Sequence, residues 1–134
     1  MTRINTICVE ELHTVHLLAE WRELPRVFTV AKKAEERGIK PNTYNIPTSF
    51  TLGKGHVKFF TNKLKWLETR YNAICEELMR RGVNISYFKI KAENKPCSKE
   101  WFNDWTPTKQ SRELIRQRIA ERIKSNPKKY AKGR

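Results

Sequence analysis

The sequence has few acidic residues and no long apolar stretch. Fourteen aspartates and glutamates stand against 28 lysines and arginines, which leaves a formal net charge of +14. No apolar run approaches the roughly 20 residues of a membrane-spanning helix, and the N-terminal stretch carries no signal-peptide pattern. These absences argue against a membrane or exported protein. We expect a location in the cytoplasm.

Cysteines are also few and poorly spaced for chemistry. Cys8, Cys75 and Cys97 are odd in number and far apart, with no CxxC pair and no metal-ligand spacing to a histidine. We expect free thiols in a reducing compartment. His16 and Glu20 have the spacing of a metal pair, but no HExxH motif or third ligand accompanies them. The sequence therefore predicts neither a metal nor another cofactor.

Positive charge is the property that the chain has in excess. A strongly basic field favours polyanions, chiefly nucleic acid or an anionic membrane surface. With no membrane-spanning segment, nucleic acid is the better interpretation. Nine basic and two acidic residues give residues 112–134 a charge of +7, half of the total. We expect phosphates at this face, with simple solvation as the alternative for each single lysine or arginine.

Hydrophobic periodicity predicts a mainly α fold, a single compact domain over residues 1–134 of three helices with long irregular connections. Apolar residues recur at three- and four-residue steps over residues 9–37, which predicts one long helix ended by Gly38. Pro25 should kink this helix, because proline removes a backbone donor and clashes with the preceding turn. Residues 39–55, rich in proline, asparagine and glycine, are expected to be irregular.

Two more helices are predicted further along the chain. The second begins at about residue 58 or 62 and ends at residue 81, where a glycine follows. The third lies between Pro107 and Pro127 and takes Thr106 or Thr108 as its cap. The alternating residues 83–90 have the pattern of a short strand, yet the sequence offers no second strand to pair with it.

Short motifs occur in a fixed order along nearly the whole chain. They are Met1-Thr2-Arg3-Ile4-Asn5, the segment His16–Phe28 with Arg22-Glu23-Leu24-Pro25-Arg26, the segment Phe50–Phe60 with Gly55-His56-Val57, then Arg81-Gly82-Val83-Asn84, Trp105-Thr106-Pro107 and Asn126-Pro127-Lys128-Lys129-Tyr130. Taken together, they resemble the pyrimidine-dimer DNA glycosylases of phages and algal viruses, often called phage-type endonuclease V.

The resemblance implies that the α-amine of Thr2 is a catalytic nucleophile. Removal of Met1 ahead of a small residue is expected to expose this amine. Such amines titrate at about 7.7–8.0, and nearby cations, Arg3 with Arg22 or Arg26, would lower the pKa further. A neutral amine that attacks C1′ of a deoxyribose displaces the base and leaves an imine. The imine permits elimination of the 3′ phosphate, so glycosylase and AP lyase activities share one intermediate.

The resemblance also implies that Glu23 is the catalytic carboxylate beside this amine. A carboxylate there would stabilise the cationic sugar and move protons during imine formation. His16, Glu20 and Glu23 fall at i, i+4 and i+7 and share one helix face. The alternative is that Glu23 only forms an ion pair with Arg22 or Arg26.

The resemblance implies a set of DNA-binding positions, since members of the family extrude a nucleotide to reach C1′. They are Arg3, His16, Arg22, Arg26, Arg118, Arg122, Lys129 and Tyr130. One position departs from the pattern, because the family typically has tryptophan followed by tyrosine where this chain has Lys129 and Tyr130. Lysine supplies charge but no stacking face, so dimer specificity is less firmly implied than the lyase chemistry.

The resulting hypothesis is a DNA N-glycosylase with a coupled AP lyase activity, acting as a monomer on lesion-containing double-stranded DNA and not on a membrane. If the source is a virus, as the resemblance implies, we expect it to act in the cytoplasm or nucleoid of the host cell. Cyclobutane pyrimidine dimers caused by ultraviolet light are the expected substrate. Two alternatives stay open: the same chemistry on another damaged or modified base, and a non-catalytic basic DNA-binding protein. Borohydride trapping separates the last from the enzymes, because only an amine lyase forms a reducible imine with DNA.

Overall fold

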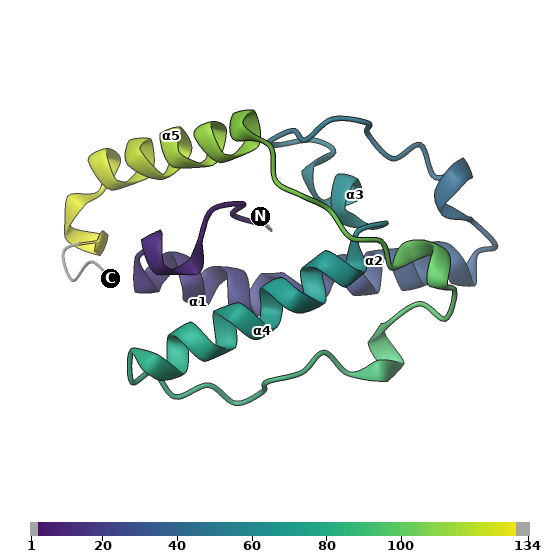
Figure 1. The fold of residues 1–134 in the computed structure, drawn as a ribbon, viewed down its shortest axis with the longest axis horizontal. Helices are drawn as coiled ribbons and strands as arrows, with labels where there is room; N and C mark the ends of the chain where they lie inside the picture. Colours follow the sequence, from purple (N-terminus) through teal and green to yellow (C-terminus); the bar gives the residue numbers. More distant parts are fainter. Residues whose placement is uncertain (1–2, 131–134) are drawn as a thin grey trace.

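A computed structural model describes residues 3–130, except for the Tyr130 side chain, and the chain there is mainly helical (Figure 1). Its helices are α1 (Thr14–Glu23), α2 (Pro25–Glu36), α3 (His56–Phe60), α4 (Leu64–Arg80) and α5 (Lys109–Ser125). The predicted mainly α fold is confirmed. Across residues 3–130, no helix combines the length and apolar character that a membrane crossing requires.

The first predicted helix is present, but it is shorter and divided in two. It begins at Thr14 rather than at Val9, because Val9–Glu11 form a separate 3-10 turn and Leu12 after them is extended. Pro25 was predicted to kink this helix, and the structure divides the helix at that residue: α1 ends at Glu23 and α2 begins at the proline, which cannot donate a helical hydrogen bond. The predicted stop at Gly38 is also confirmed, with a φ of 80°.

The second predicted helix is divided as well, into α3 and α4, with Lys63 in a non-helical conformation between them. α4 ends as predicted, because Gly82 has a φ of 79°. The N–H groups of Gly82 and Val83 then donate hydrogen bonds to the carbonyls of Met79 and Leu78 in the last turn of the helix. The third helix, α5, takes Thr108 rather than Thr106 as its cap, and the Thr108 hydroxyl accepts the N–H of Ser111 at 3.0 Å.

Residues 83–90 form no strand, and within the described part of the chain the only β-type pairing is an isolated bridge elsewhere. This stretch has no neighbouring strand to pair with. It is held instead by Trp21 of α1, whose indole N–H donates to the Tyr87 carbonyl at 3.2 Å and whose ring stacks on that of Tyr87. The alternating pattern therefore reflects contact with a helix rather than with a sheet.

The core lies where α1 packs against α4 and α2 continues past them. Leu17 and Leu24 near the two ends of α1, Phe28 of α2, and Leu67 and Ile74 of α4 are fully buried. Burial of such side chains stabilises the fold by about 1.5–3 kcal/mol each. Because α1 and α4 are fixed in this way, the polar face of α1 is presented as a rigid surface.

α5 contributes one buried apolar side chain to this core, that of Ile115, and the partly buried Ile119 packs against it. Only Ser111 and Ile115 of the helix are buried, so most of its surface is left to basic side chains. The N-terminal segment runs between α5 and α1, as Figure 1 shows. The basic C-terminal half of α5 therefore faces the polar face of α1 across the first residues of the chain.

A buried carboxylate joins the end of α4 to the start of α1. Glu77 accepts hydrogen bonds from Arg80 at 2.9 Å and from Arg81 at 2.7 Å. Arg81 also donates to the Thr14 hydroxyl at 3.2 Å and to the Val9 carbonyl at 3.3 Å. The hydrogen bonds from Arg80 first, and from Arg81 next, lower the pKa of Glu77 to about 2.

We expect Glu77→Gln to lower the free energy of unfolding by about 3 kcal/mol, because it leaves the Arg81 charge buried without its partner. An unfolded glutamate titrates near 4.3, above the folded value, so this stabilisation is complete above that pH and is lost as the pH falls towards 2. Urea midpoints of the two proteins should therefore converge between about pH 5 and pH 2. Exposed Glu76→Gln is the matched control, and a pH-independent difference would contradict the prediction.

Candidate active site

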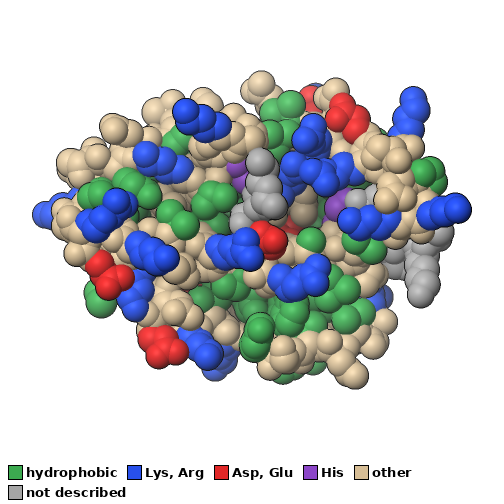
Figure 2. All heavy atoms as spheres, turned by 180° about the vertical axis from the view of Figure 1, so that it is seen from behind, with side chains coloured by type: hydrophobic (Ala, Val, Ile, Leu, Met, Phe, Trp, Pro, Cys, Tyr) green, Lys and Arg blue, Asp and Glu red, His purple; other side chains and the backbone are tan. Residues whose placement is uncertain are grey.

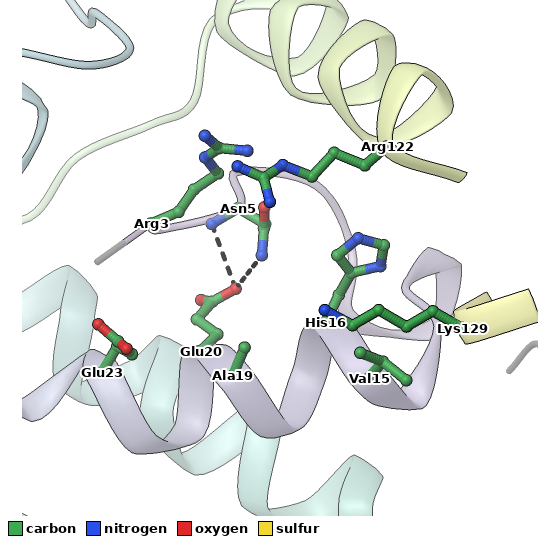
Figure 3. Close-up of a pocket in the computed structure, with 9 residues that line it drawn as sticks. All are labelled: Arg3, Asn5, Val15, His16, Ala19, Glu20, Glu23, Arg122 and Lys129. Atoms are coloured by element: carbon green, nitrogen blue, oxygen red, sulfur yellow. Dashed lines mark hydrogen bonds between the residues drawn. The ribbon is translucent and has the colours of Figure 1, made fainter. Parts of the chain in front are cut away.

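A pocket opens between the N-terminal segment, α1 and the C-terminal end of α5 (Figure 3). It is lined by Arg3, Asn5, Val15, His16, Ala19, Glu20, Glu23, Arg122 and Lys129. Seven of these residues lie within the first 23 positions, and Arg122 and Lys129 lie about 100 positions further along the chain. The pocket therefore exists only in the folded chain, and its walls carry both acidic and basic groups.

Glu23 lies in the last turn of α1, and its side chain is 25% exposed. One oxygen accepts a hydrogen bond from the guanidinium of Arg26 at 3.3 Å, so the ion pair considered as an alternative is present. The Arg26 side chain is 67% exposed, and pairs of this kind contribute only about 0–1 kcal/mol. The ion pair therefore does not by itself explain a carboxylate in a basic pocket.

Glu20 lies one turn earlier on the same face, but its environment differs. It is 1% exposed, and its carboxylate accepts the Asn5 backbone N–H at 3.2 Å and the Asn5 side-chain amide at 2.8 Å (Figure 3). Arg70 of α4 donates to it at 2.7 Å and also donates to the Ile7 carbonyl. Glu20 thus ties the N-terminal segment to α1 and α4, whereas Glu23 is partly open to the pocket.

His16 lies in the same wall of the pocket, on α1. Its pKa is lowered to about 4, first by burial and then by its electrostatic interactions with His13, Arg122, Lys129 and Arg3, in that order. The imidazole is therefore neutral at physiological pH. Its predicted contact with DNA therefore cannot rest on a positive charge.

His56, at the start of α3, is 2% exposed and makes two hydrogen bonds to backbone groups. Its Nε2 accepts the N–H of Ile4 at 2.8 Å, and its Nδ1 lies 2.8 Å from the Thr51 carbonyl. Since the first partner can only donate and the second can only accept, the ring is the neutral Nδ1–H tautomer. Burial is the main cause that lowers its pKa; the Arg3 charge also lowers it, whereas the Thr51 bond and Glu20 raise it.

Five of the residues predicted for the site line this one pocket, and three do not. Arg3, His16, Glu23, Arg122 and Lys129 are brought together. Arg22 and Arg26 are exposed beside the pocket, and Arg118 is exposed with its guanidinium 3.8 Å from Glu121. Figure 2 shows lysine and arginine side chains gathered around the centre of one face, together with acidic and histidine side chains. Thr2 lies outside the described residues, as does the side chain of Tyr130.

Four residues at the site were given no role by the sequence. Asn5, Glu20, His56 and Arg70 form the hydrogen bonds that hold the N-terminal segment. Asn5 and His56 occur in the motifs, and Glu20 follows His16 by one helical turn. The sequence therefore showed these three residues, but it did not show which groups they bind. Across residues 3–130, no group of three histidine, cysteine, aspartate or glutamate side chains is arranged to hold a metal ion. The three cysteines are free thiols, as predicted.

Comparison with known protein families shows a match over residues 1–91. The matching family is described as pyrimidine dimer DNA glycosylase. The matched part contains the N-terminal segment and helices α1 to α4, and so includes every residue of the pocket except Arg122 and Lys129.

Proposed function

The chain belongs to the pyrimidine dimer DNA glycosylase family and is thus a DNA repair glycosylase, and we propose that it excises cyclobutane pyrimidine dimers through an imine between the Thr2 α-amine and deoxyribose C1′. The same intermediate would give it an AP lyase activity. We further propose that it acts as a monomer on double-stranded DNA.

Arg3 supplies the observation that supports this mechanism best. It directly follows Thr2 in the chain, and its side chain lines the same pocket as Glu23. Since successive Cα atoms are about 3.8 Å apart, a pocket that contains Arg3 is within reach of the Thr2 amine. A carboxylate and an amine in one basic pocket are the groups that imine chemistry on an anionic substrate requires.

The cations of the pocket favour the neutral form of such an amine. His16 reports their effect, because Arg122, Lys129 and Arg3 all contribute to the lowering of its pKa. The same field would lower the pKa of an α-amine, which starts at about 7.7–8.0. A large fraction of the amine would then be unprotonated and nucleophilic at neutral pH.

In the proposed reaction the amine attacks C1′, and the bond from C1′ to the base breaks; the base leaves with the electron pair and takes a proton from solvent. Glu23 stabilises the positive charge that develops at C1′ as the base leaves. It then accepts a proton from the attached nitrogen and passes it to the ring oxygen, which leaves C1′ as the imine forms. Loss of a proton from C2′ expels the 3′ phosphate and cuts the strand. Arg3 and Arg122 would bind the phosphates on either side.

A second candidate is the same chemistry on another damaged base, and Lys129 favours it. This residue lines the pocket at the position where the family pattern has tryptophan. Base stacking on an aromatic ring contributes about 1–3 kcal/mol, and lysine cannot supply it. Recognition by charge instead of stacking would widen the range of lesions.

Borohydride trapping on defined oligonucleotides tests both candidates. We expect a covalent protein–DNA adduct with duplexes that carry a pyrimidine dimer or an abasic site, and none with the undamaged duplex. Duplexes with oxidised bases distinguish the two substrate classes, since only the second candidate predicts an adduct with them. A protein that binds all of these duplexes but forms no adduct would be a non-catalytic DNA-binding protein, and the proposal would be wrong.

A further inference from the structure

Three buried side chains hold the N-terminal segment at successive points. His56 accepts the N–H of Ile4 at 2.8 Å. Glu20 accepts the N–H of Asn5 at 3.2 Å, and Arg70, which pairs with Glu20, donates to the carbonyl of Ile7. The segment is thus tied to α3, α1 and α4, and the hydrogen bond to His56 of α3 is made at Ile4.

We infer that His56 is a positioning residue for the Thr2 amine, which it holds in place through the Ile4 N–H, a role that rests on the proposed function. The Ile4 nitrogen is two residues after Thr2, so the two nitrogens are at most about 7 Å apart along the chain. Loss of this hydrogen bond would let the amine move relative to Glu23.

The surroundings of His56 keep its ring in one orientation. Its Nδ1–H is held by the Thr51 carbonyl at 2.8 Å. The rings of Phe50 and Phe60 pack edge-on against it, with centroids 5.5 Å and 5.3 Å away. The imidazole of His56 is therefore fixed relative to α3 and the two phenylalanine rings. Through its hydrogen bond, it fixes the backbone at Ile4 in the same way.

The hydrogen bond requires a neutral ring. Protonation would place a hydrogen on Nε2, where it would oppose the Ile4 N–H. The charged groups that face the ring are Arg3 on the N-terminal segment, which disfavours protonation, and Glu20 on α1, which favours it. The bond is therefore intact at neutral pH and is broken only in acid, below the usual range of a histidine.

Two substitutions test the role of His56. His56→Leu removes the acceptor, and His56→Gln keeps an acceptor at about the position of Nε2. We expect His56→Leu to slow single-turnover borohydride trapping on abasic DNA by about 100-fold, the cost of misplacing a reacting group by about 1 Å. The dissociation constant for the same duplex should change less than threefold, and His56→Gln should recover at least tenfold of the rate. Thr61→Val, a fully buried change at the end of α3, controls for loss of stability alone.

A backbone variant removes the donor without touching any side chain. Cys8 allows a synthetic segment to be joined to the rest of the chain, so an ester can replace the Ile4 amide. We expect this ester to slow trapping as much as His56→Leu does, and to add nothing when the two are combined. An all-amide protein made in the same way is the control.

Several results would overturn the inference. They are trapping at the wild-type rate in His56→Leu, a fall in rate matched by an equal fall in affinity, an ester that traps normally, or a Thr61→Val protein as slow as His56→Leu. If the wild-type protein itself forms no adduct, the proposed function fails and the inference fails with it. If the wild-type protein traps and the variants trap equally well, only the inference fails.

Discussion

A protein that keeps Met1, or carries a tag ahead of Thr2, is expected to lose borohydride trapping on dimer and abasic duplexes by at least about 1000-fold. The physical reason is that acylation converts the Thr2 amine into an amide, which is not a nucleophile. A new terminal amine would also lie about 3.8 Å or more from the required position. Affinity for undamaged duplex should change little, because Arg3, Arg122 and the other cations are retained.

Intact mass spectrometry establishes which residue begins each protein, and removal of the tag to leave Thr2 should restore trapping. Two lysines provide matched controls. Lys129 lines the pocket, and the pKa of Lys63 is lowered to about 8 by burial, although it lines a different cavity. Lys129→Arg and Lys63→Arg should both still trap. If the tagged protein traps and either lysine variant does not, that lysine is the nucleophile and our assignment of Thr2 is wrong.

The helical regions could be predicted because apolar residues at three- and four-residue steps form the buried face of a helix. The break at Pro25 and the stops at Gly38 and Gly82 followed from the backbone chemistry of proline and glycine. The start at Thr14 could not be predicted in this way. A 3-10 turn at Val9–Glu11 keeps a three-residue spacing like that of a helix, so the pattern alone does not show that the chain becomes extended after it.

The sequence identified the catalytic candidates of the site, but it did not predict the hydrogen bonds that hold the N-terminal segment. Glu23 and Arg3 lie in motifs, whereas the contacts of Glu20, His56 and Arg70 with the N-terminal segment join residues 15 to 63 positions apart. No local pattern encodes such partners. A buried carboxylate and an exposed one at i and i+3 look alike in a sequence, and only the fold separates a structural Glu20 from a partly open Glu23.

On the basic face of α5, the sequence also did not show which arginine lines the pocket. Arg118 and Arg122 were both predicted to bind DNA, and they are one turn apart. A turn moves a side chain by about 6 Å along the helix, and only Arg122 lines the pocket. Arg118 remains a predicted phosphate contact outside it.

Glu23→Gln is expected to reduce single-turnover incision of dimer and abasic duplexes by about 1000-fold, because a neutral amide cannot stabilise the cationic sugar or relay a proton. Affinity for the same duplexes should be unchanged or slightly higher, since one negative charge near the phosphates is removed. Gel-shift affinities and incision rates measured on the same duplex separate the two effects. The loss should appear in the rate constant at saturating protein, as expected for an interaction made in the transition state.

Arg26→Gln is the matched control, because it breaks the same 3.3 Å ion pair from the other side. It should weaken binding and reduce the slope of log K against log salt by about one unit, the effect of one lost phosphate contact, while incision at saturating protein stays within about tenfold of the wild type. If the ion pair itself were the function of Glu23, both substitutions would have the same small effect on stability and neither would stop incision. Near-normal turnover in Glu23→Gln would therefore make the carboxylate a surface partner of Arg26 and leave the cationic sugar to be stabilised by another group.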